Sequence, residues 1–281
     1  MSVNSKNIKG RLQSVKQTRK ITNAMYLLST ARMKKELPQA EFRCEFAEKL
    51  KNSVYDLLSS EESKKLKSVY INPVENAPLA YLVITGDKGL CGSYNTDVIQ
   101  KLKDEIKDKN EASFTVYGFG KTAGELIKNA GIEINEIFDG SASHPDFETA
   151  ESITKKLIDE YISGRISGIN IICNTLARKG KPVRLIKLLP LESREKTEKN
   201  EIIFEPDFET LFERVTESYC YGTVYSVLSL CALNENSARM NAMKAATDNA
   251  DEMSEKLERE MNSQRQLEVT NEITEITAGR H

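Results

Sequence analysis

The chain has 281 residues with 40 basic and 42 acidic side chains, and this near balance does not indicate a polyanionic partner. Charged residues make up 29% of the sequence and aromatic residues 7%, a composition that suits long solvated helices better than a thick core. No run approaches the length of about 18 apolar residues that a membrane span requires, and the polar, basic N-terminus lacks the apolar segment of a secretory signal.

Residues 1–58 carry an apolar pattern at helical spacing and predict one long helix. The apolar stripe consists of Ile8, Leu12, Val15, Ile21, Met25 and Leu28. Proline removes a helical hydrogen bond, so we expect a kink or a short break near Pro38. Residues 59–68 are polar, and we interpret 59–77 as a linker.

Basic charge is concentrated in residues 1–35, which contain nine Lys and Arg residues and no Asp or Glu. Three interpretations are open. One is a nucleic-acid-binding arm, although the interleaved aromatic residues of such arms are missing. The second is a solvated basic face. The third is charge neutralisation inside the molecule by the acidic residues of segment 251–260.

Between residues 78 and 205, short apolar runs alternate with helical patterns, which predicts an α/β domain with a Rossmann-like, mostly parallel sheet. The predicted strands are 79–85, 113–119, 169–175 and 183–189, and the predicted helices are about 95–108, 121–130 and 147–163. The last strand follows a turn at 178–182, so we expect it to be antiparallel to the strand before it.

The first predicted strand ends in a glycine-rich turn, Gly-Asp-Lys-Gly-Leu-Cys-Gly at 86–92. Such turns between a strand and a helix often cradle phosphate. The Gly-x-x-Gly-x-x-Gly spacing, however, matches neither the dinucleotide fingerprint nor the P-loop. The alternative is a tight turn in which glycine allows positive φ and a close approach of the backbone to a neighbour.

Five cysteines and two histidines offer few groups for metal or redox chemistry. No Cys-x-x-Cys pair occurs, His144 lies in a serine-rich turn and His281 is the last residue. We therefore expect no metal site, no disulfide framework, no cofactor, no catalytic residue and a reducing compartment.

Residues 207–278 predict a second and much longer helix. Asp207 follows Pro206 and is a good N-cap residue. A seven-residue repeat of steps of three and four indicates packing along another helix. Its members are Met243, Ala246, Ala250, Met253, Leu257, Met261, Gln264, Leu267 and Asn271. Seventy helical residues extend over about 105 Å.

Both long helices leave the α/β domain at its boundaries, near residues 57 and 207, so we expect them to form an antiparallel coiled coil. Facing residues of such a pair have numbers that sum to about 264. Met25 then faces Arg239, and the basic segment lies against the acidic segment 251–260. Residues 264–281 then have no partner within the chain. Because they carry several large apolar residues, we expect an external partner to enclose them.

Several sequence blocks, in this order, resemble the gamma subunit family of the F-type ATP synthases. They are 8–15 (Ile-Lys-Gly-Arg-Leu-Gln-Ser-Val), 20–25 (Lys-Ile-Thr-Asn-Ala-Met), 86–95 (Gly-Asp-Lys-Gly-Leu-Cys-Gly-Ser-Tyr-Asn), 238–250 (Ala-Arg-Met-Asn-Ala-Met-Lys-Ala-Ala-Thr-Asp-Asn-Ala) and 269–279 (Val-Thr-Asn-Glu-Ile-Thr-Glu-Ile-Thr-Ala-Gly). They span both ends and the middle, so the resemblance covers the whole chain.

The resemblance implies a rotor without a catalytic site of its own. The two terminal helices would form the central rotating shaft inside a ring of alternating alpha and beta subunits. The α/β domain would form a foot on the membrane ring of c subunits, beside the epsilon subunit. Proton flow would turn the shaft and drive ATP synthesis or hydrolysis on beta. The expected location is the cytoplasmic face of a bacterial plasma membrane, as a peripheral protein.

Because these blocks match motifs of the family, the resemblance also implies contacts with partner subunits for seven residues of this chain. They are Met25, Arg239, Arg265, Gln266 and Thr270 for the alpha/beta ring, and Phe204 and Glu205 for the c ring and epsilon. An alternative for Met25 is a plain seam residue of the coiled coil.

The chain departs from the family pattern at Pro38, at Arg280-His281 where alanines are usual, and in lacking the dithiol insertion of chloroplast members. Two rival interpretations are a nucleotide-binding α/β enzyme with helical extensions, and a static coiled-coil scaffold or nucleic-acid binder.

Overall fold

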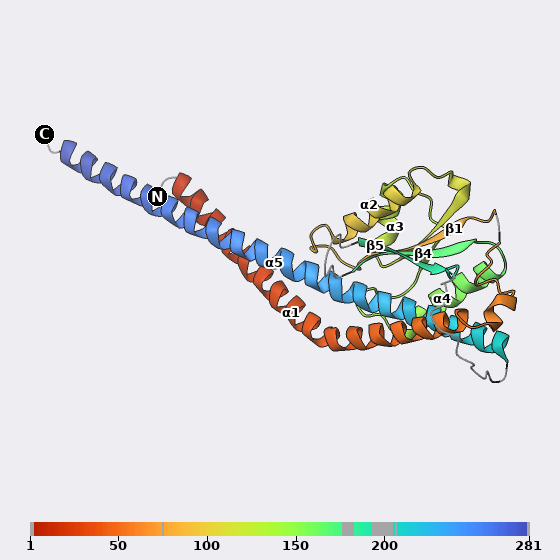
Figure 1. The fold of residues 1–281 in the computed structure, drawn as a ribbon. Helices are drawn as coiled ribbons and strands as arrows, with labels where there is room; N and C mark the ends of the chain where they lie inside the picture. Colours follow the sequence, from red (N-terminus) through yellow and green to blue (C-terminus); the bar gives the residue numbers. More distant parts are fainter. Residues whose placement is uncertain (1–2, 75, 176–182, 193–204, 206, 280–281) are drawn as a thin grey trace. The chain divides into compact units, whose positions relative to one another are not determined.

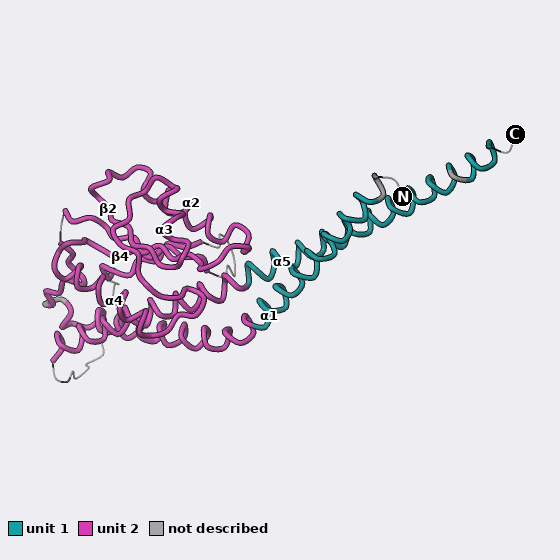
Figure 2. The backbone as a smooth tube through the Cα atoms, turned by 180° about the vertical axis from the view of Figure 1, so that it is seen from behind, with its two compact units in different colours: residues 1–31, 237–281 teal, residues 32–236 magenta. Residues whose placement is uncertain are grey.

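The computed structural model describes residues 3–74, 76–175, 183–192, 205 and 207–279, and the chain divides into two compact units. Unit 1 contains residues 1–31 and 237–281, and unit 2 contains residues 32–236 (Figure 2). Both boundaries between the units fall inside long helices. The division of the sequence into segments 1–58, 59–77, 78–205 and 207–278 stays a prediction.

Unit 2 contains a five-stranded sheet in the order β3-β2-β1-β4-β5 (Figure 1). The strands are β1 (Leu79–Ile84), β2 (Phe114–Phe119), β3 (Glu136–Phe138), β4 (Gly168–Asn174) and β5 (Val183–Leu189). β5 is antiparallel to β4, and the other neighbours pair in parallel. The predicted α/β class with a mostly parallel sheet is confirmed, as is the antiparallel last strand. The turn predicted at 178–182 lies outside the described residues.

Three helices and one short 3-10 turn, η2, lie between the strands, and a second 3-10 turn, η1, precedes β1. They are α2 (Tyr94–Ile106), α3 (Ala123–Asn129), α4 (Phe147–Ile162), η1 (Glu62–Lys65) and η2 (Glu111–Ser113). The predicted helices correspond to α2, α3 and α4. The short strand β3 was not predicted, because three residues are too few to show an alternating pattern.

Each face of the sheet has its own core, because side chains alternate between the two faces along a strand. On one face, Val83 and Ile172 pack with residues of α2 and α3 such as Val98 and Ile127. The core of the other face joins the sheet to α4 and to the unit 2 parts of both long helices. It includes Leu82, Ile171, Leu157, Val54 and Leu228.

The two long helices are α1 (Val3–Leu58) and α5 (Phe208–Ala278). α1 continues through Pro38, so the alternative of a short break there is wrong. Asp207 caps α5 as predicted, since Thr210 N donates to its Oδ1 at 2.9 Å. This backbone hydrogen bond is the main cause that lowers the pKa of Asp207.

Candidate functional site

The seam between the two helices of unit 1 contains buried hydroxyl-bearing side chains beside apolar ones. Thr22 and Ser29 of α1 are buried, and so are Thr247 and Ser254 of α5. The hydroxyl oxygens of Thr22 and Thr247 are 2.8 Å apart. Small seam residues allow helices to approach closely, because the side chains at the contact set the interaxial distance.

These buried hydroxyls correct the predicted seam. Met243, Ala250 and Leu257 are buried as predicted, but Met253 is 50% exposed and Ser254 lies in the seam instead. The Ser254 hydroxyl donates to the Ala250 carbonyl at 2.8 Å, which is why it can be buried at little cost.

On α1 the predicted apolar stripe is wrong at two positions. Ile21 is 62% and Leu28 is 54% exposed, whereas the neighbouring Thr22 and Ser29 are buried. The Thr22 hydroxyl also lies 3.1 Å from the Arg19 carbonyl, so it has polar partners inside the seam. Large apolar side chains therefore face outward where smaller polar ones face inward.

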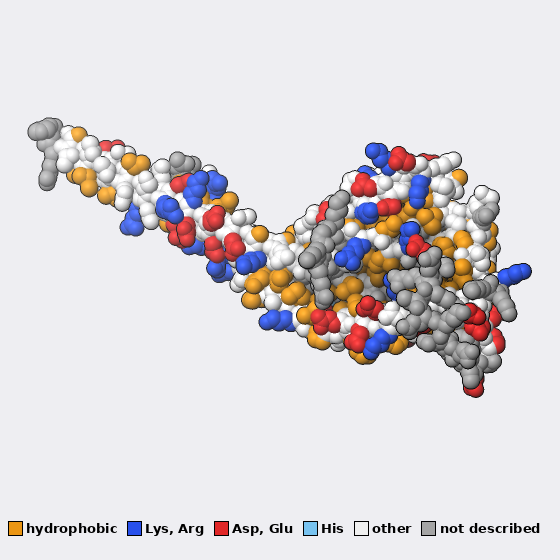
Figure 3. Space-filling view, viewed as in Figure 1, with side chains coloured by type: hydrophobic (Ala, Val, Ile, Leu, Met, Phe, Trp, Pro, Cys, Tyr) orange, Lys and Arg blue, Asp and Glu red, His pale blue; other side chains and the backbone are white. Residues whose placement is uncertain are grey.

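Two basic residues of α1 pair with the acidic segment 251–260 of α5 within unit 1. Lys16 Nζ lies 2.6 Å from Glu258 Oε1, and Arg19 pairs with Asp251. The hydrogen bond from Arg19 to Asp251 is the main cause that raises the pKa of Arg19. Figure 3 shows both signs of charge gathered where these two helices run together. The third interpretation of the basic charge, neutralisation by segment 251–260, is confirmed for Lys16 and Arg19.

The helices run antiparallel as predicted, but their register differs. The prediction placed Thr22 near residue 242, whereas the structure places it against Thr247. The displacement of five residues exceeds one helical turn. In the observed register Arg239 lies at the level of about residue 30, more than one turn from Met25, so the predicted pairing of these two residues is wrong.

Unit 1 exposes an extensive set of large apolar side chains, which we call the unit 1 apolar surface. Its members are Ile21, Leu27, Leu28, Met253, Leu267, Val269, Ile273 and Ile276. The last four lie at the C-terminal end of α5, which extends alone beyond the N-terminal end of α1 (Figure 2). Val269, Ile273 and Ile276 are spaced by four and three residues, so they lie on one face of α5, and a cluster of exposed apolar side chains indicates an interaction site.

The sequence-predicted contact residues are distributed unevenly over this surface. Arg265, Gln266 and Thr270 are exposed on the same stretch of α5, and the Thr270 hydroxyl donates to the Gln266 carbonyl at 2.8 Å. Met25 is half-buried beside the exposed Leu28. Arg239 is only 7% exposed.

The two predicted foot contacts lie outside unit 1. Glu205 is exposed, and Phe204 lies outside the described residues. Sequence reasoning missed Leu27 and assigned Ile21 and Leu28 to the seam. Treating Thr22 and Ser29 as seam residues would have pointed to this outward-facing apolar set.

The glycine-rich turn of unit 2 makes contacts that leave little room for phosphate. Gly86 N donates to Asn95 Oδ1 at 2.8 Å, so this amide is already occupied. A Cβ at Gly86 would lie 2.8 Å from Cδ of the buried Glu235. An anion at this turn would thus meet a carboxylate, and the alternative of a close backbone approach agrees better with the structure.

Among the described residues, no helix has the length and apolarity of a membrane span, and no group of three His, Cys, Asp or Glu side chains could hold a metal ion.

Comparison with solved structures shows the same fold in central-stalk chains. A chain of the Euglena gracilis mitochondrial ATP synthase, in a cryo-EM structure of its OSCP/F1/c-ring, matches with a TM-score of 0.70 at 15% identity, over 98% of this chain and 93% of that one. A chain of the Tetrahymena thermophila mitochondrial ATP synthase central stalk and c-ring matches with a TM-score of 0.58 at 23% identity, over 80% of this chain and 99% of that one.

Sequence comparison finds relatives with higher sequence identity than these two structures. Residues 4–281 match the family model described as ATP synthase. The ATP synthase gamma chain of Clostridium beijerinckii is 33% identical over 97% of this chain and 95% of its own length. That of Lactococcus lactis subsp. cremoris is 30% identical over 99% of both chains. The chain therefore belongs to the ATP synthase gamma chain family.

Proposed function

We propose that the chain is the central rotating shaft of an F-type ATP synthase, which couples proton flow through a membrane ring to ATP synthesis or hydrolysis on an alpha/beta ring. The observation that carries this proposal is the distribution of side chains in unit 1. On α1, the hydroxyl-bearing Thr22 and Ser29 face the seam, and the larger Ile21 and Leu28 face outward. A coiled coil of this kind needs an enclosing partner, because exposed apolar surface costs free energy in water.

The C-terminal end of α5 gives a further reason to expect an enclosing partner. In the observed register, the described part of α1 ends opposite about residue 266, so roughly 18 Å of helix at the end of α5 extends beyond it. A helix of this length is marginal in water by itself. A ring of surrounding subunits would cover it on all sides.

A shaft must also transmit torque along its length. α5 is an unbroken helix of 71 residues that belongs to both units, so a turning force on unit 1 reaches unit 2 through one continuous hydrogen-bonded backbone. Within unit 1, the Thr22–Thr247 hydroxyl contact and two ion pairs link α1 to α5, so twisting one helix without the other would break these contacts.

The contact residues follow from this arrangement as proposals. Arg265, Gln266 and Thr270 would meet the beta subunits near the tip, because they are exposed beside the uncovered apolar residues. Met25 would contact the ring together with Ile21 and Leu28. Arg239 would need a change of side-chain conformation to reach a partner, because it is buried in the isolated chain.

The remaining partners and the location are part of the same proposal. Phe204 and Glu205 would contact the c ring and the epsilon subunit, and the chain would lie peripherally on the cytoplasmic face of a bacterial plasma membrane. ATP chemistry would take place on the ring subunits, so this chain would have no catalytic residue.

Affinity purification of the tagged full-length chain from its native host, followed by native mass spectrometry, tests this function. We expect one complex that contains alpha and beta subunits with this chain in a single copy. Recovery of the chain without ATPase subunits would contradict the proposal. A thermal shift assay in which ATP or NAD stabilises the isolated chain would favour the alternative interpretation, a nucleotide-binding α/β enzyme with helical extensions.

A further inference from the structure

The carboxyl ends of β1 and β4 form the place where an open α/β sheet commonly holds a ligand. β2 pairs with one edge of β1 and β4 pairs with the other, so the strand order reverses at this point. Ligands of such sheets bind in the crevice outside the carboxyl ends of the two strands. In this chain α5 lies there instead, and Gly86, just after β1, is in contact with Glu235. Asn234 Nδ2 donates to the carbonyl of Asn174, the last residue of β4, at 2.8 Å.

Two side-chain oxygen atoms beside this contact have no hydrogen-bond partner among the described residues. They are Asn234 Oδ1 and Thr175 Oγ1. The two residues are only 4% and 7% exposed, so bulk water does not compensate these atoms. A buried polar atom that stays unpaired costs free energy, and native proteins pair nearly all such atoms. The two oxygen atoms therefore need a partner other than the described side chains and backbone.

The backbone turns both oxygen atoms toward the same space. Side chains alternate along a strand, and Cys173 of β4 belongs to the core between the sheet and α5. Thr175, two residues further on, therefore points to the same side, toward α5. The Asn234 carboxamide is held at the adjoining residue by its hydrogen bond to the Asn174 carbonyl. Both oxygen atoms thus lie between the end of β4 and α5.

We propose that one buried water molecule bridges Asn234 Oδ1 and Thr175 Oγ1 and completes the contact of α5 with the carboxyl end of the sheet. Water can donate to the carboxamide oxygen and can either donate to or accept from the hydroxyl. Buried waters typically make about two to four hydrogen bonds to groups that lack other partners. A metal ion fits less well, because it needs more oxygen ligands, and no group of three His, Cys, Asp or Glu side chains in the described part of the chain could hold one.

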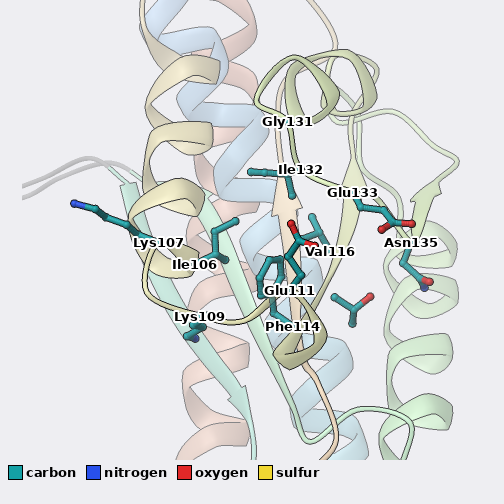
Figure 4. A pocket seen from close by; sticks show the side chains of 11 residues that line it. Ile106, Lys107, Lys109, Glu111, Phe114, Val116, Gly131, Ile132, Glu133 and Asn135 are labelled. Carbon is teal, nitrogen blue, oxygen red and sulfur yellow. The ribbon is translucent and has the colours of Figure 1, made fainter.

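A cavity near the other end of the sheet offers no comparable pair of atoms. It has a volume of about 590 Å³ and lies beside Phe114, at the amino end of β2 (Figure 4). Its lining residues are all described, and none of them has a buried polar side-chain atom without a partner. Lys107 points away from the cavity, and Lys109 is hydrogen-bonded to the Tyr81 hydroxyl. The crevice at β1 and β4 is therefore the better supported site.

The sign of one stability change tests the proposal in the isolated full-length chain, independently of the rotary function. If a water bridges the two oxygen atoms, Thr175→Val removes a hydrogen bond, and the urea midpoint of unfolding should fall. If the hydroxyl is unpaired, valine removes it at nearly constant shape, and the midpoint should rise. Tyrosine fluorescence measures the midpoint in unit 2, because Tyr26 is the one tyrosine of the sequence outside that unit.

Thr216→Val is the matched control. Thr216 Oγ1 is also buried without a partner among the described residues, but its helical neighbours Phe212 and Cys220 belong to the apolar core. Valine should raise the urea midpoint there, because it removes an unpaired hydroxyl from apolar surroundings. The proposal therefore predicts opposite signs for the two variants, and the same sign for both would overturn it.

A double variant tests whether the Thr175 hydroxyl acts through Asn234. The fall caused by Thr175→Val should be at least halved in an Asn234→Leu background, because leucine removes the other partner of the water. Circular dichroism confirms that each variant is folded. An equal fall in both backgrounds would overturn the proposal, since the hydroxyl would then be paired with some other group.

Discussion

Gly86 at the end of β1 and Glu235 of α5 are in direct contact, and a Cβ at Gly86 would lie only 2.8 Å from Glu235 Cδ. Glu235 is 1% exposed, and its Oε2 lies 3.4 Å from the Ser143 hydroxyl. The glycine-rich turn therefore packs its backbone against a buried carboxylate on the long helix. This contact holds the carboxyl end of the sheet against α5 within unit 2.

Gly86→Ala should lower the free energy of unfolding by about 1–3 kcal/mol, because the added methyl group overpacks the contact with Glu235. Urea denaturation followed by circular dichroism measures the change. Gly89→Ala is the matched control in the same turn, since no atom lies within 4 Å of a Cβ there. Equal stability of the two variants would show that the close approach is unimportant.

Asp87 should make the stability of unit 2 depend on acid pH. Burial opposes its ionisation, but hydrogen bonds from Ser143 N at 3.0 Å, from the Ser141 hydroxyl, and from Ala142 N and Lys121 N outweigh burial and lower the pKa of Asp87. The stabilisation is then present above the unfolded-state pKa of about 3.9 and is lost as pH falls through the lower folded-state pKa.

Asp87→Asn should therefore be clearly less stable than the unchanged chain at pH 6, and the difference should shrink as the pH falls below about 4. Urea denaturation across pH 3–7 measures it, with Asp108→Asn at an exposed position as control. A difference that stays constant with pH would mean that the charge of Asp87 does not matter.

The helix register can be tested by cross-linking. Thr22→Cys/Thr247→Cys should form a disulfide readily under mild oxidation, because the two hydroxyl oxygens are 2.8 Å apart. Thr22→Cys/Ala242→Cys tests the register expected from sequence alone and should remain reduced. Non-reducing electrophoresis distinguishes the two species, and efficient cross-linking of the second pair would contradict the observed register.

Removing residues 264–281 should weaken coupling more than assembly. The deleted segment carries the uncovered end of α5, whereas the sheet and its cores lie in unit 2. ATP-driven proton pumping by vesicles containing the truncated complex should fall relative to ATP hydrolysis. Full proton pumping by the truncated complex would mean that coupling does not require residues 264–281.

The strands were predictable where the chain is buried on both faces. β1 has the sequence Leu-Ala-Tyr-Leu-Val-Ile and is buried from Ala80 to Ile84, and such a run stands out as continuous apolar sequence. β3 has three residues and is defined by its pairing with β2, which a linear pattern does not reveal. The buried Glu235 could not be predicted either, because an acidic residue on a helix normally faces solvent.

The coiled coil was predictable in direction and charge but not in register. A seven-residue repeat is compatible with several registers, and nothing in it tells how far one helix extends past the end of its partner. Counting large apolar residues also placed Ile21 in the seam, although the buried neighbour is Thr22, whose hydroxyl is satisfied by Thr247 and by the Arg19 carbonyl. Because large apolar residues were assumed to lie in the seam, the outward-facing apolar residues of α1 were not predicted as a contact surface.

Direct observation of rotation tests the central claim most directly. A gold nanorod is attached through biotin to Lys103→Cys, an exposed position on α2, in a Cys44→Ser background of the purified, surface-immobilised complex. We predict unidirectional rotation of the nanorod that requires ATP and stops when ATP is removed. A complex that hydrolyses ATP at an undiminished rate while the nanorod remains stationary would contradict the assignment of this chain as the shaft.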